Sequence, residues 1–122
     1  MKKILPIIML FIPLIIHAET VIFNKTFGGI ENDYANSVQQ TADGGYIVGG
    51  QTDSYGSGSN LMPDMWIIKL DKTGNKEWDK TFGGEKSDIA FSVQQIKDLG
   101  YIVAGTTSSF GKGYPAIWII KL

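Results

Sequence analysis

The sequence contains no cysteine and no arginine, and its single histidine is His17. Without cysteine, neither a disulfide framework nor a thiolate metal site can form. Arginine makes the bidentate contacts that recognition of phosphate and guanine prefers. A mildly acidic chain without arginine, with a formal net charge of −1, is therefore a poor candidate for binding nucleic acid.

The first eighteen residues have the layout of a secretory signal peptide. Lys2 and Lys3 precede an apolar run over residues 4–16, and Ala18 precedes the change to polar sequence at Glu19. A membrane anchor is the alternative, but this run is too short to cross about 30 Å of hydrocarbon as a helix. Two prolines also interrupt it. We therefore predict cleavage after Ala18 and export to the periplasm, cell surface or medium, with no membrane span remaining.

Export would leave a chain, residues 19–122, that has no imidazole and a net charge of −3, because His17, Lys2 and Lys3 are removed. Ser-His-Asp and Cys-His catalysis and the usual zinc sites are then excluded. Acid–base chemistry by paired carboxylates and oxygen-ligated calcium remain open. Asp43-Gly-Gly resembles one end of a calcium loop but lacks the alternating Asp/Asn pattern. We expect no catalytic residues, no metal and no cofactor.

A long internal repeat organises the rest of the chain. The sequence Lys-Thr-Phe-Gly-Gly occurs at residues 25–29 and again at 80–84. Residues 26–56 align with 81–111 without a gap, with 19 of 31 positions identical, and Trp-Ile-Ile-Lys-Leu recurs at 66–70 and 118–122. The exported region therefore consists of repeat 1 at about residues 25–79 and repeat 2 at about 80–122.

Short β-rich segments separated by turn sequences predict an all-β fold. Tight turns are expected at 42–45, 71–75 and 97–100, where Gly, Asp and Asn gather, whereas 53–64 and 110–115 read as longer loops. Two stretches, 33–40 and 88–95, are ambiguous between helix and strand. The predicted strands cover residues 21–27, 37–41, 46–52, 65–70, 76–82, 92–96, 101–107 and 116–122.

Four strands per period of about 50 residues favour the blade of a β-propeller, a four-stranded antiparallel meander, over a sandwich or a small meander sheet. We therefore predict two blade-type sheets that form a partial propeller. The second would be completed by the N-terminal strand or left open. The order of strands fits a closed ring joined by its ends as well as a truncated piece of a longer repeat protein.

The repeat unit resembles that of bacterial secreted β-propeller proteins. The resemblance rests on Thr-Phe-Gly-Gly, Asp-Gly-Gly-Tyr-Ile-Val and Trp-Ile-Ile-Lys-Leu-Asp followed by Gly-Asn, and it covers residues 21–122. It implies a structural or recognition platform at a bacterial surface and says little about activity. The chain departs from the family in having about two blades, and in carrying Leu99 where the first copy has Gly44.

The long loops form one end of the predicted blades, where binding residues usually gather. Candidate ligand-binding residues there are Asp33, Tyr34, Tyr55, Asp64, Asp88 and Tyr114. A structural role competes for the matched Asp33 and Asp88, because Asp in a Gly-rich loop commonly bonds nearby backbone N–H groups. The recurring tryptophans are expected to pack within the sheets, and the lysines of residues 69–80, which alternate with acids, to lie on a solvated surface.

Three functions follow from these features. The leading hypothesis is a secreted, non-enzymatic propeller repeat protein that acts in binding or as a structural module, alone or as a fragment of a longer propeller. Since two blades cannot close a ring, copies of the chain would be its own partners. The alternatives are an oligomeric, lectin-like propeller that binds carbohydrate, and a glycan-active enzyme that uses two carboxylates. A glycan or a surface protein is the expected external partner.

Overall fold

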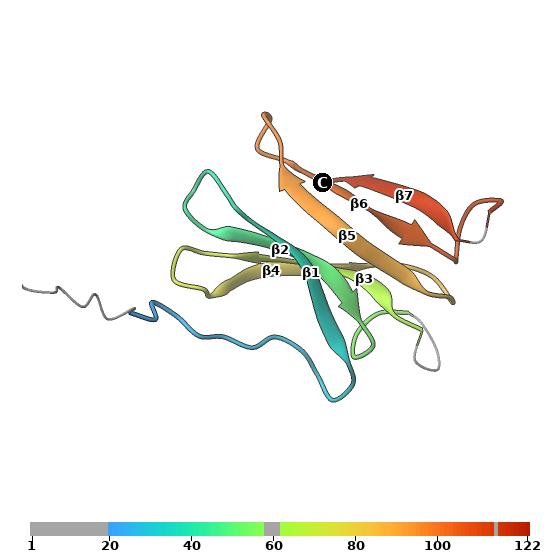
Figure 1. Cartoon of the computed structure of the whole chain (residues 1–122), viewed down its shortest axis with the longest axis horizontal. Coiled ribbons are helices and arrows are strands. Elements are labelled where there is room, and N and C mark those ends of the chain that lie inside the picture. The colour runs from blue at the N-terminus through green and yellow to red at the C-terminus, as the bar shows by residue number, and fades with distance from the viewer. Residues whose placement is uncertain (1–19, 58–61, 114) are drawn as a thin grey trace, which may run out of the picture.

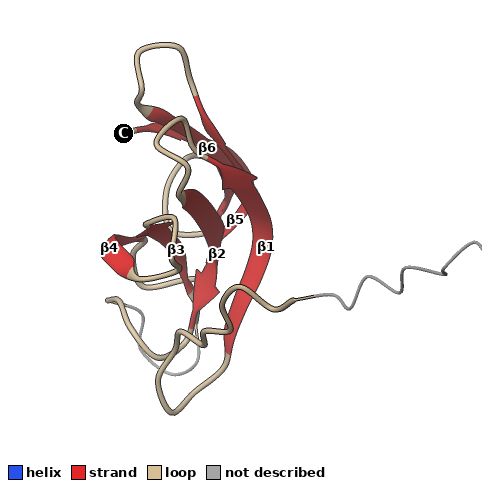
Figure 2. Cartoon of the chain, turned by 90° about the vertical axis from the view of Figure 1, so that its left-hand side faces the viewer, coloured by secondary structure: helices blue, strands red, loops and turns tan. Residues whose placement is uncertain are grey.

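The computed structural model describes residues 20–57, 62–113 and 115–122. Within these ranges the chain is all-β, with seven strands and no helix (Figures 1 and 2). The predicted signal peptide, residues 1–18, lies outside the described residues. The strands are β1 (Asp33–Gln40), β2 (Tyr46–Thr52), β3 (Asp64–Leu70), β4 (Lys76–Phe82), β5 (Asp88–Gln95), β6 (Tyr101–Thr107) and β7 (Ala116–Lys121).

The strands form two antiparallel meanders. Sheet 1 has the order β1-β2-β3-β4, and sheet 2 has the order β5-β6-β7. The repeat in sequence becomes a repeat in register, because Val38 faces Val48 in sheet 1 just as Val93 faces Val103 in sheet 2. The two sheets therefore present equivalent residues at equivalent places, and sheet 2 lacks the counterpart of β4 among the described residues.

A bulge recurs in the first strand of each sheet. The register shifts between Ala35 and Ser37 in β1, and at the corresponding place in β5. The bulge brings backbone very close to a glycine of the next strand: a Cβ on Gly50 would lie 1.8 Å from the carbonyl oxygen of Tyr34. Gly105 has the same constraint at 1.9 Å from the oxygen of Ile89. These two glycines are required by the close approach of two backbones.

Most of the predicted strands are confirmed, with differences at their ends. β2, β4 and β6 have the predicted bounds, and β3 and β7 differ by one residue. β1 and β5 begin four residues earlier than predicted, so the two ambiguous stretches are strands. β1 begins with Asp-Tyr-Ala-Asn and β5 with Asp-Ile-Ala-Phe, and in both strands the bulge interrupts the alternation of side chains that marks a strand.

The prediction of a strand over residues 21–27 is wrong. This segment is extended but pairs with no strand of the described chain, although its composition suits a strand. It runs along the face of sheet 1 that points away from sheet 2 (Figure 1). It therefore does not complete sheet 2 within its own chain, and sheet 2 is left open.

The main core lies between the two sheets. Sheet 1 contributes Ile47, Met65 and Ile67, and sheet 2 contributes Val93 and Val103, all at most 3% exposed. Trp78, Phe82 and Trp118 pack around this core, in agreement with the expectation that tryptophans pack the sheets. Burial of these apolar side chains is the main force that holds sheet 2 against sheet 1.

A second apolar cluster covers the other side of sheet 1. Trp66, Ile68 and Leu70 of β3 alternate with the residues that face sheet 2, and Phe27 of the N-terminal segment packs against them. Tyr46 joins this cluster and meets Phe23 edge-on, with ring centroids 5.7 Å apart. We call this the far face of sheet 1. β3 is thus buried on both sides, as its unbroken burial shows.

The expectation that the lysines of residues 69–80 are all solvated is wrong for Lys69. Its side chain is buried between the sheets, and its ammonium lies 2.9 Å from a carboxylate oxygen of Asp43 and 3.2 Å from one of Glu77. It also donates to the carbonyl of Leu70 at 2.8 Å. Burial opposes the charge of Lys69, but the bonds to Asp43 and Glu77 outweigh it and raise the pKa of the ammonium.

Leu99 provides a test of the turn geometry. It adopts φ 65°, whereas the equivalent Gly44 has φ 82°, and a residue with a Cβ pays about 1–2 kcal/mol in this region. Leu99→Gly removes this strain, but glycine also gives the unfolded chain more entropy, which offsets part of the gain. We therefore expect Leu99→Gly to raise the free energy of unfolding by about 0.5–1 kcal/mol. Urea denaturation measures this. The reciprocal control, Gly44→Leu, should lower stability; a loss of stability in Leu99→Gly would contradict the account.

Asp71 gives the turn 71–75 a pH dependence. Its carboxylate accepts hydrogen bonds from the N–H groups of Asn75 and Thr73 and from the Thr73 hydroxyl, and these lower the pKa of Asp71 from 3.8 to about 2. A carboxylate with a lowered folded pKa stabilises the fold above pH 3.8 and loses that contribution as the pH falls towards 2.

We therefore expect the melting temperature to fall more steeply between about pH 4 and pH 2 in the wild type than in Asp71→Asn, which cannot titrate. Melting curves of both proteins at a series of pH values measure the difference. Equal slopes in the two proteins would show that these hydrogen bonds do not form in solution.

Candidate functional site on the long-loop face

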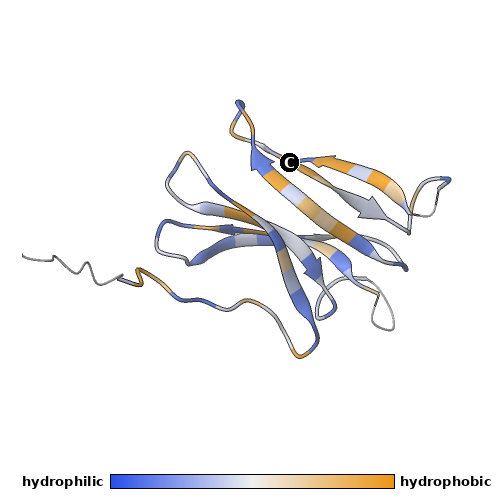
Figure 3. Cartoon of the chain, viewed as in Figure 1, coloured by the Kyte–Doolittle hydropathy of each residue, from blue (hydrophilic) through white to orange (hydrophobic). Residues whose placement is uncertain are grey.

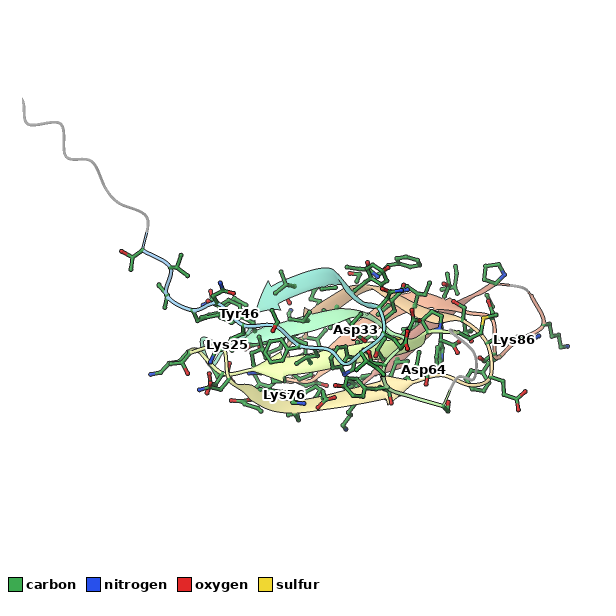
Figure 4. The ribbon with its side chains drawn as sticks, turned by 90° about the horizontal axis from the view of Figure 1, so that it is seen from below. Lys25, Asp33, Tyr46, Asp64, Lys76 and Lys86 are labelled. Atoms are coloured by element: carbon green, nitrogen blue, oxygen red, sulfur yellow. The ribbon has the colours of Figure 1, made fainter. Side chains whose placement is uncertain are left out.

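The tight turns and the long connections lie at opposite ends of the sheets. Turns at 41–45, 71–75 and 96–100 form one end, and the connections that precede β1, β3, β5 and β7 form the other. Figure 4 shows Asp33, Asp64 and Lys86 towards the long-loop end, and Tyr46 and Lys76 towards the turn end. Five of the six predicted site residues are described, and they lie in or next to the long-loop end.

Asp33 holds two long connections together. Its carboxylate accepts hydrogen bonds from the N–H of Gly29 at 2.9 Å and from the hydroxyl of Ser54 at 2.7 Å, and another from the hydroxyl of Thr52. The N–H of Glu31 in turn donates to the Ser54 oxygen at 3.1 Å. One side chain at the start of β1 thus fixes both the Gly-Gly loop and the loop that follows β2.

Asp88 does the same in sheet 2. It accepts from the N–H of Gly84 at 3.0 Å and from the hydroxyl of Ser109 at 2.6 Å, and the N–H of Lys86 donates to Ser109 at 3.0 Å. Thr107 accepts from the N–H groups of Ser109 and Phe110, as Thr52 does from Ser54 and Tyr55. The contacts of Asp33 and Asp88 therefore match the structural role that competes with ligand binding, in which an aspartate bonds groups of its own loops.

The hydrogen bonds also keep Asp33 ionised. Partial burial raises the pKa of a carboxyl, but the donors Thr52 and Ser54 and the N–H of Gly29 outweigh burial and lower the pKa of Asp33. An acid of this kind is a poor proton donor at neutral pH. Its charge is instead compensated by the polar groups of the loops that it organises.

The sequence analysis missed the serines that bond these aspartates and the threonines that bond the same loops. Thr52 and Ser54 recur as Thr107 and Ser109 at the same offset as Asp33 and Asp88. That joint recurrence was the available signal, because Asp, Thr and Ser at fixed spacing can bond one another across a loop. Repeated polar residues in this chain therefore mark loop anchors.

The aromatic candidates divide into anchored and open residues. Tyr55 packs on Trp66 with ring centroids 5.3 Å apart, and its hydroxyl donates to the carbonyl of Gly28 at 2.9 Å. Phe110 repeats the ring contact on Trp118. Tyr34 is half exposed on β1, and Tyr114 lies outside the described residues. Tyr55 thus helps to fix a loop, and Tyr34 offers the more open ring.

Asp64 and Asp88 are brought together around Gly83. A Cβ placed on Gly83 would lie 2.2 Å from Asp64 Oδ1 and 2.9 Å from Asp88 Oδ2. Asp64 accepts from the N–H of Ser57 at 2.7 Å, while the Oδ1 atoms of both aspartates have no hydrogen-bond partner among the described residues. Both side chains are buried, so a substrate at the surface has no access to this pair.

A cavity lies on the far face of sheet 1. It has a volume of about 230 Å³, and Phe27, Val48, Gly50, Trp66 and Ile68 are among the residues that line it. Asp33 and Tyr34 stand at the same cavity. Its lining is mainly apolar, with Lys25 as its cation. This hollow belongs to the surface that sheet 2 does not cover.

Comparison with known proteins leaves the family open, since no protein-family model and no curated protein matches the chain. In the described ranges, no three His, Cys, Asp or Glu residues are grouped so that they could hold a metal ion. The same ranges contain no helix that is long and apolar enough to cross a membrane. The function is therefore inferred from the chain's own contacts.

The two aspartates are expected to differ in their contribution to stability. Asp88 is fully buried, whereas Asp33 is partly exposed. In Asp88→Ala the half-buried N–H of Gly84 and hydroxyl of Ser109 lose their acceptor at a buried position, which costs about 2–3 kcal/mol. In Asp33→Ala water can replace the carboxylate, and the cost is about 1 kcal/mol.

Denaturant unfolding of the two variants measures this difference. Glu85→Ala, a change at an exposed acid in the loop that precedes Asp88, is the control and should leave stability within about 0.5 kcal/mol. An Asp88→Ala protein as stable as this control would show that Asp88 does not anchor the loops.

Proposed function

We propose that this chain is an exported, non-enzymatic module of β-propeller-type blades that acts in binding or as a structural element. The N-terminal signal sequence supports export, to the periplasm, the cell surface or the medium. The resemblance to bacterial secreted propeller proteins supports the platform role. A glycan or a surface protein is the external partner of such a platform.

The stacking of the sheets supports the blade assignment. Each sheet is a meander in which the chain passes from the first strand to the last, and β4 leads directly into β5. The first strands of the two sheets touch, with the N–H of Val93 donating to the Ser37 hydroxyl at 3.2 Å and the N–H of Gln95 to the Gln39 amide oxygen at 2.8 Å. First strands side by side are what radially arranged blades require.

The hydrogen bonding of the aspartates on the long-loop face is the main support for the proposal. Asp33 accepts from the N–H and hydroxyl groups of its loops with both carboxylate oxygens, and Asp88 does so with its Oδ2 oxygen. Glycoside hydrolysis needs two carboxylates that flank a bound substrate about 5–10 Å apart. Asp64 and Asp88 are near each other but buried. The face is therefore better suited to contact than to chemistry.

Expression with the native N-terminus tests the proposal. We expect the chain in the extracytoplasmic fraction with Glu19 as its first residue, which mass spectrometry of the intact protein identifies. Ile8→Arg places a charge in the apolar run and should retain the chain in the cytoplasm, whereas Ile30→Arg, outside that run, should not. Cytoplasmic accumulation of the uncleaved wild type would refute export.

The same purified protein tests the second half of the proposal. Incubation with a panel of glycans should leave every glycan chemically unchanged. Retention on one glycan class would identify the module as lectin-like. Release of shortened or unsaturated sugars would overturn the non-enzymatic assignment, and loss of that release in Asp64→Asn would point to the buried pair.

A further inference from the structure

Two faces of the molecule expose apolar side chains, and these are equivalents of residues that meet in the core. On sheet 2, Ile117 and Ile119 occupy the positions of Met65 and Ile67 in the repeat, but they are 83% and 56% exposed where Met65 and Ile67 are fully buried. On sheet 1, Val38 is 66% exposed, and its equivalent Val93 is 3% exposed. Figure 3 shows the apolar stripe along β7.

The N-terminal segment occupies, against sheet 1, the place that β4 occupies against sheet 2. Phe23 meets Tyr46 at 5.7 Å and 64°, and the equivalent Trp78 meets Tyr101 at 5.8 Å and 67°. Phe27 packs on the far face of sheet 1, as Phe82 packs in the core beside sheet 2. Residues 21–27 are thus positioned like the last strand of a sheet that stands before sheet 1.

β7 is the strand that such a segment would complete. It pairs with β6 along one edge, and its other edge pairs with no described strand. In sheet 1 the equivalent edge of β3 pairs with β4, with Met65 opposite Phe82 and Ile67 opposite Lys80. An unpaired edge of this kind is a template for a strand from another chain.

The cavity on the far face of sheet 1 has a filled counterpart in the core. A Cβ on Gly105 would lie 2.9 Å from the Met65 methyl, because Met65 reaches into that place from sheet 1. Its equivalent Gly50 lines the cavity of about 230 Å³, and the nearest atoms to a Cβ there are backbone of Tyr34 and Ala35. The repeat equivalent of Met65 is the exposed Ile117.

We propose that sheet 2 of one copy packs on the far face of sheet 1 in a second copy, and that β7 of the first copy pairs antiparallel with residues 21–27 of the second. This inference rests on the proposed blade architecture. The register follows from that of β3 and β4: Ile117 stands opposite Phe27 of the second copy, Ile119 opposite Lys25, and Lys121 opposite Phe23. Ile117 fills the cavity beside Gly50 of the second copy.

Two of the hydrogen bonds between the sheets have counterparts at this interface, whereas the bond from the Asn36 amide to the Ala90 carbonyl has none, because Phe91 occupies the equivalent position. The bond from the N–H of Val93 to Ser37 becomes one from Val38 of the second copy to the hydroxyl of Ser92. The bond from Gln95 to Gln39 becomes one from the N–H of Gln40 of the second copy to the Gln94 amide oxygen. The repeat therefore supplies both the apolar and the polar halves of the contact.

The interface differs from the core at Ala104, which replaces Gly49 of the first repeat. A Cβ on Gly49 would lie 3.2 Å from Val93, so Ala104 needs Val38 of the second copy to move by a few tenths of an ångström. Because the contact joins two different faces, it repeats from copy to copy and closes a ring if the rotation allows. A closed propeller has about four to eight blades, so two, three or four copies with two sheets each would complete one.

The mass of the full chain in solution tests the association. Multi-angle light scattering should give one discrete mass of two to four copies. Ile117→Asp places a charge in the cavity of the second copy and should weaken association at least about tenfold. The control Ile30→Asp changes an equally apolar and exposed residue outside the interface and should leave the mass unchanged. Since both positions are exposed, circular dichroism should show both variants folded.

Cross-linking tests the register. The wild type has no cysteine, so a mixture of Lys25→Cys and Ile119→Cys chains should form a disulfide-linked pair on mild oxidation, because directly opposed residues bring their Cβ atoms within about 5 Å. Asn24→Cys mixed with Ile119→Cys is the matched control and should give at least about tenfold less product, since adjacent residues of a strand point to opposite faces.

The outcomes separate this inference from the proposed function. A folded monomer, or an oligomer that forms equally well in Ile117→Asp and gives no Lys25–Ile119 cross-link, overturns the inference while leaving export and glycan binding to be judged by their own assays. Conversely, a discrete oligomer with the predicted cross-link upholds the inference even if the glycan panel reveals an enzyme.

Discussion

The packing of sheet 1 against sheet 2 is the contact on which the rest of this structure depends. Each sheet alone is too small to bury its apolar residues, and only the face-to-face contact removes Met65, Ile67 and Val103 from water. That contact also buries Lys69 between two carboxylates, where the ion pairs offset the cost of removing its charge from water. Each sheet carries two apolar faces, and the contact within the chain uses one face of each. The equivalent residues on the other faces, on β7 and β1, therefore stay exposed.

The loops are held by a different kind of interaction. Asp33 and Asp88 use hydrogen bonds to fix connections that have few apolar residues of their own. The repeated threonines and serines of the same loops add hydrogen bonds that make each long-loop region a defined surface beside the sheets. In the proposed platform role, this surface would present side chains to a partner while Asp33 and Asp88 hold its loops in place.

Much of the fold could be predicted from the sequence, because the repeat aligns one set of strands with another. The bounds of β2, β4 and β6 follow from composition and turns, whereas the early starts of β1 and β5 depend on a bulge that disrupts the alternating pattern. Residues 21–27 have a strand's composition, but a strand also needs a partner, and local sequence cannot supply one. The burial of Lys69 and the meeting of Asp64 with Asp88 at Gly83 arise only when the sheets stack.

Backbone hydrogen exchange at residues 21–27 tests the central claim, that sheet 2 of one copy packs on the far face of sheet 1 in another. If β7 of another copy pairs with this segment, its amide protons should become protected together with those of β7 as the protein concentration rises through the range of assembly. Fast exchange at residues 21–27 at every concentration, beside persistent protection of β2 and β3, would contradict the claim and leave the two-sheet unit as a self-contained fold.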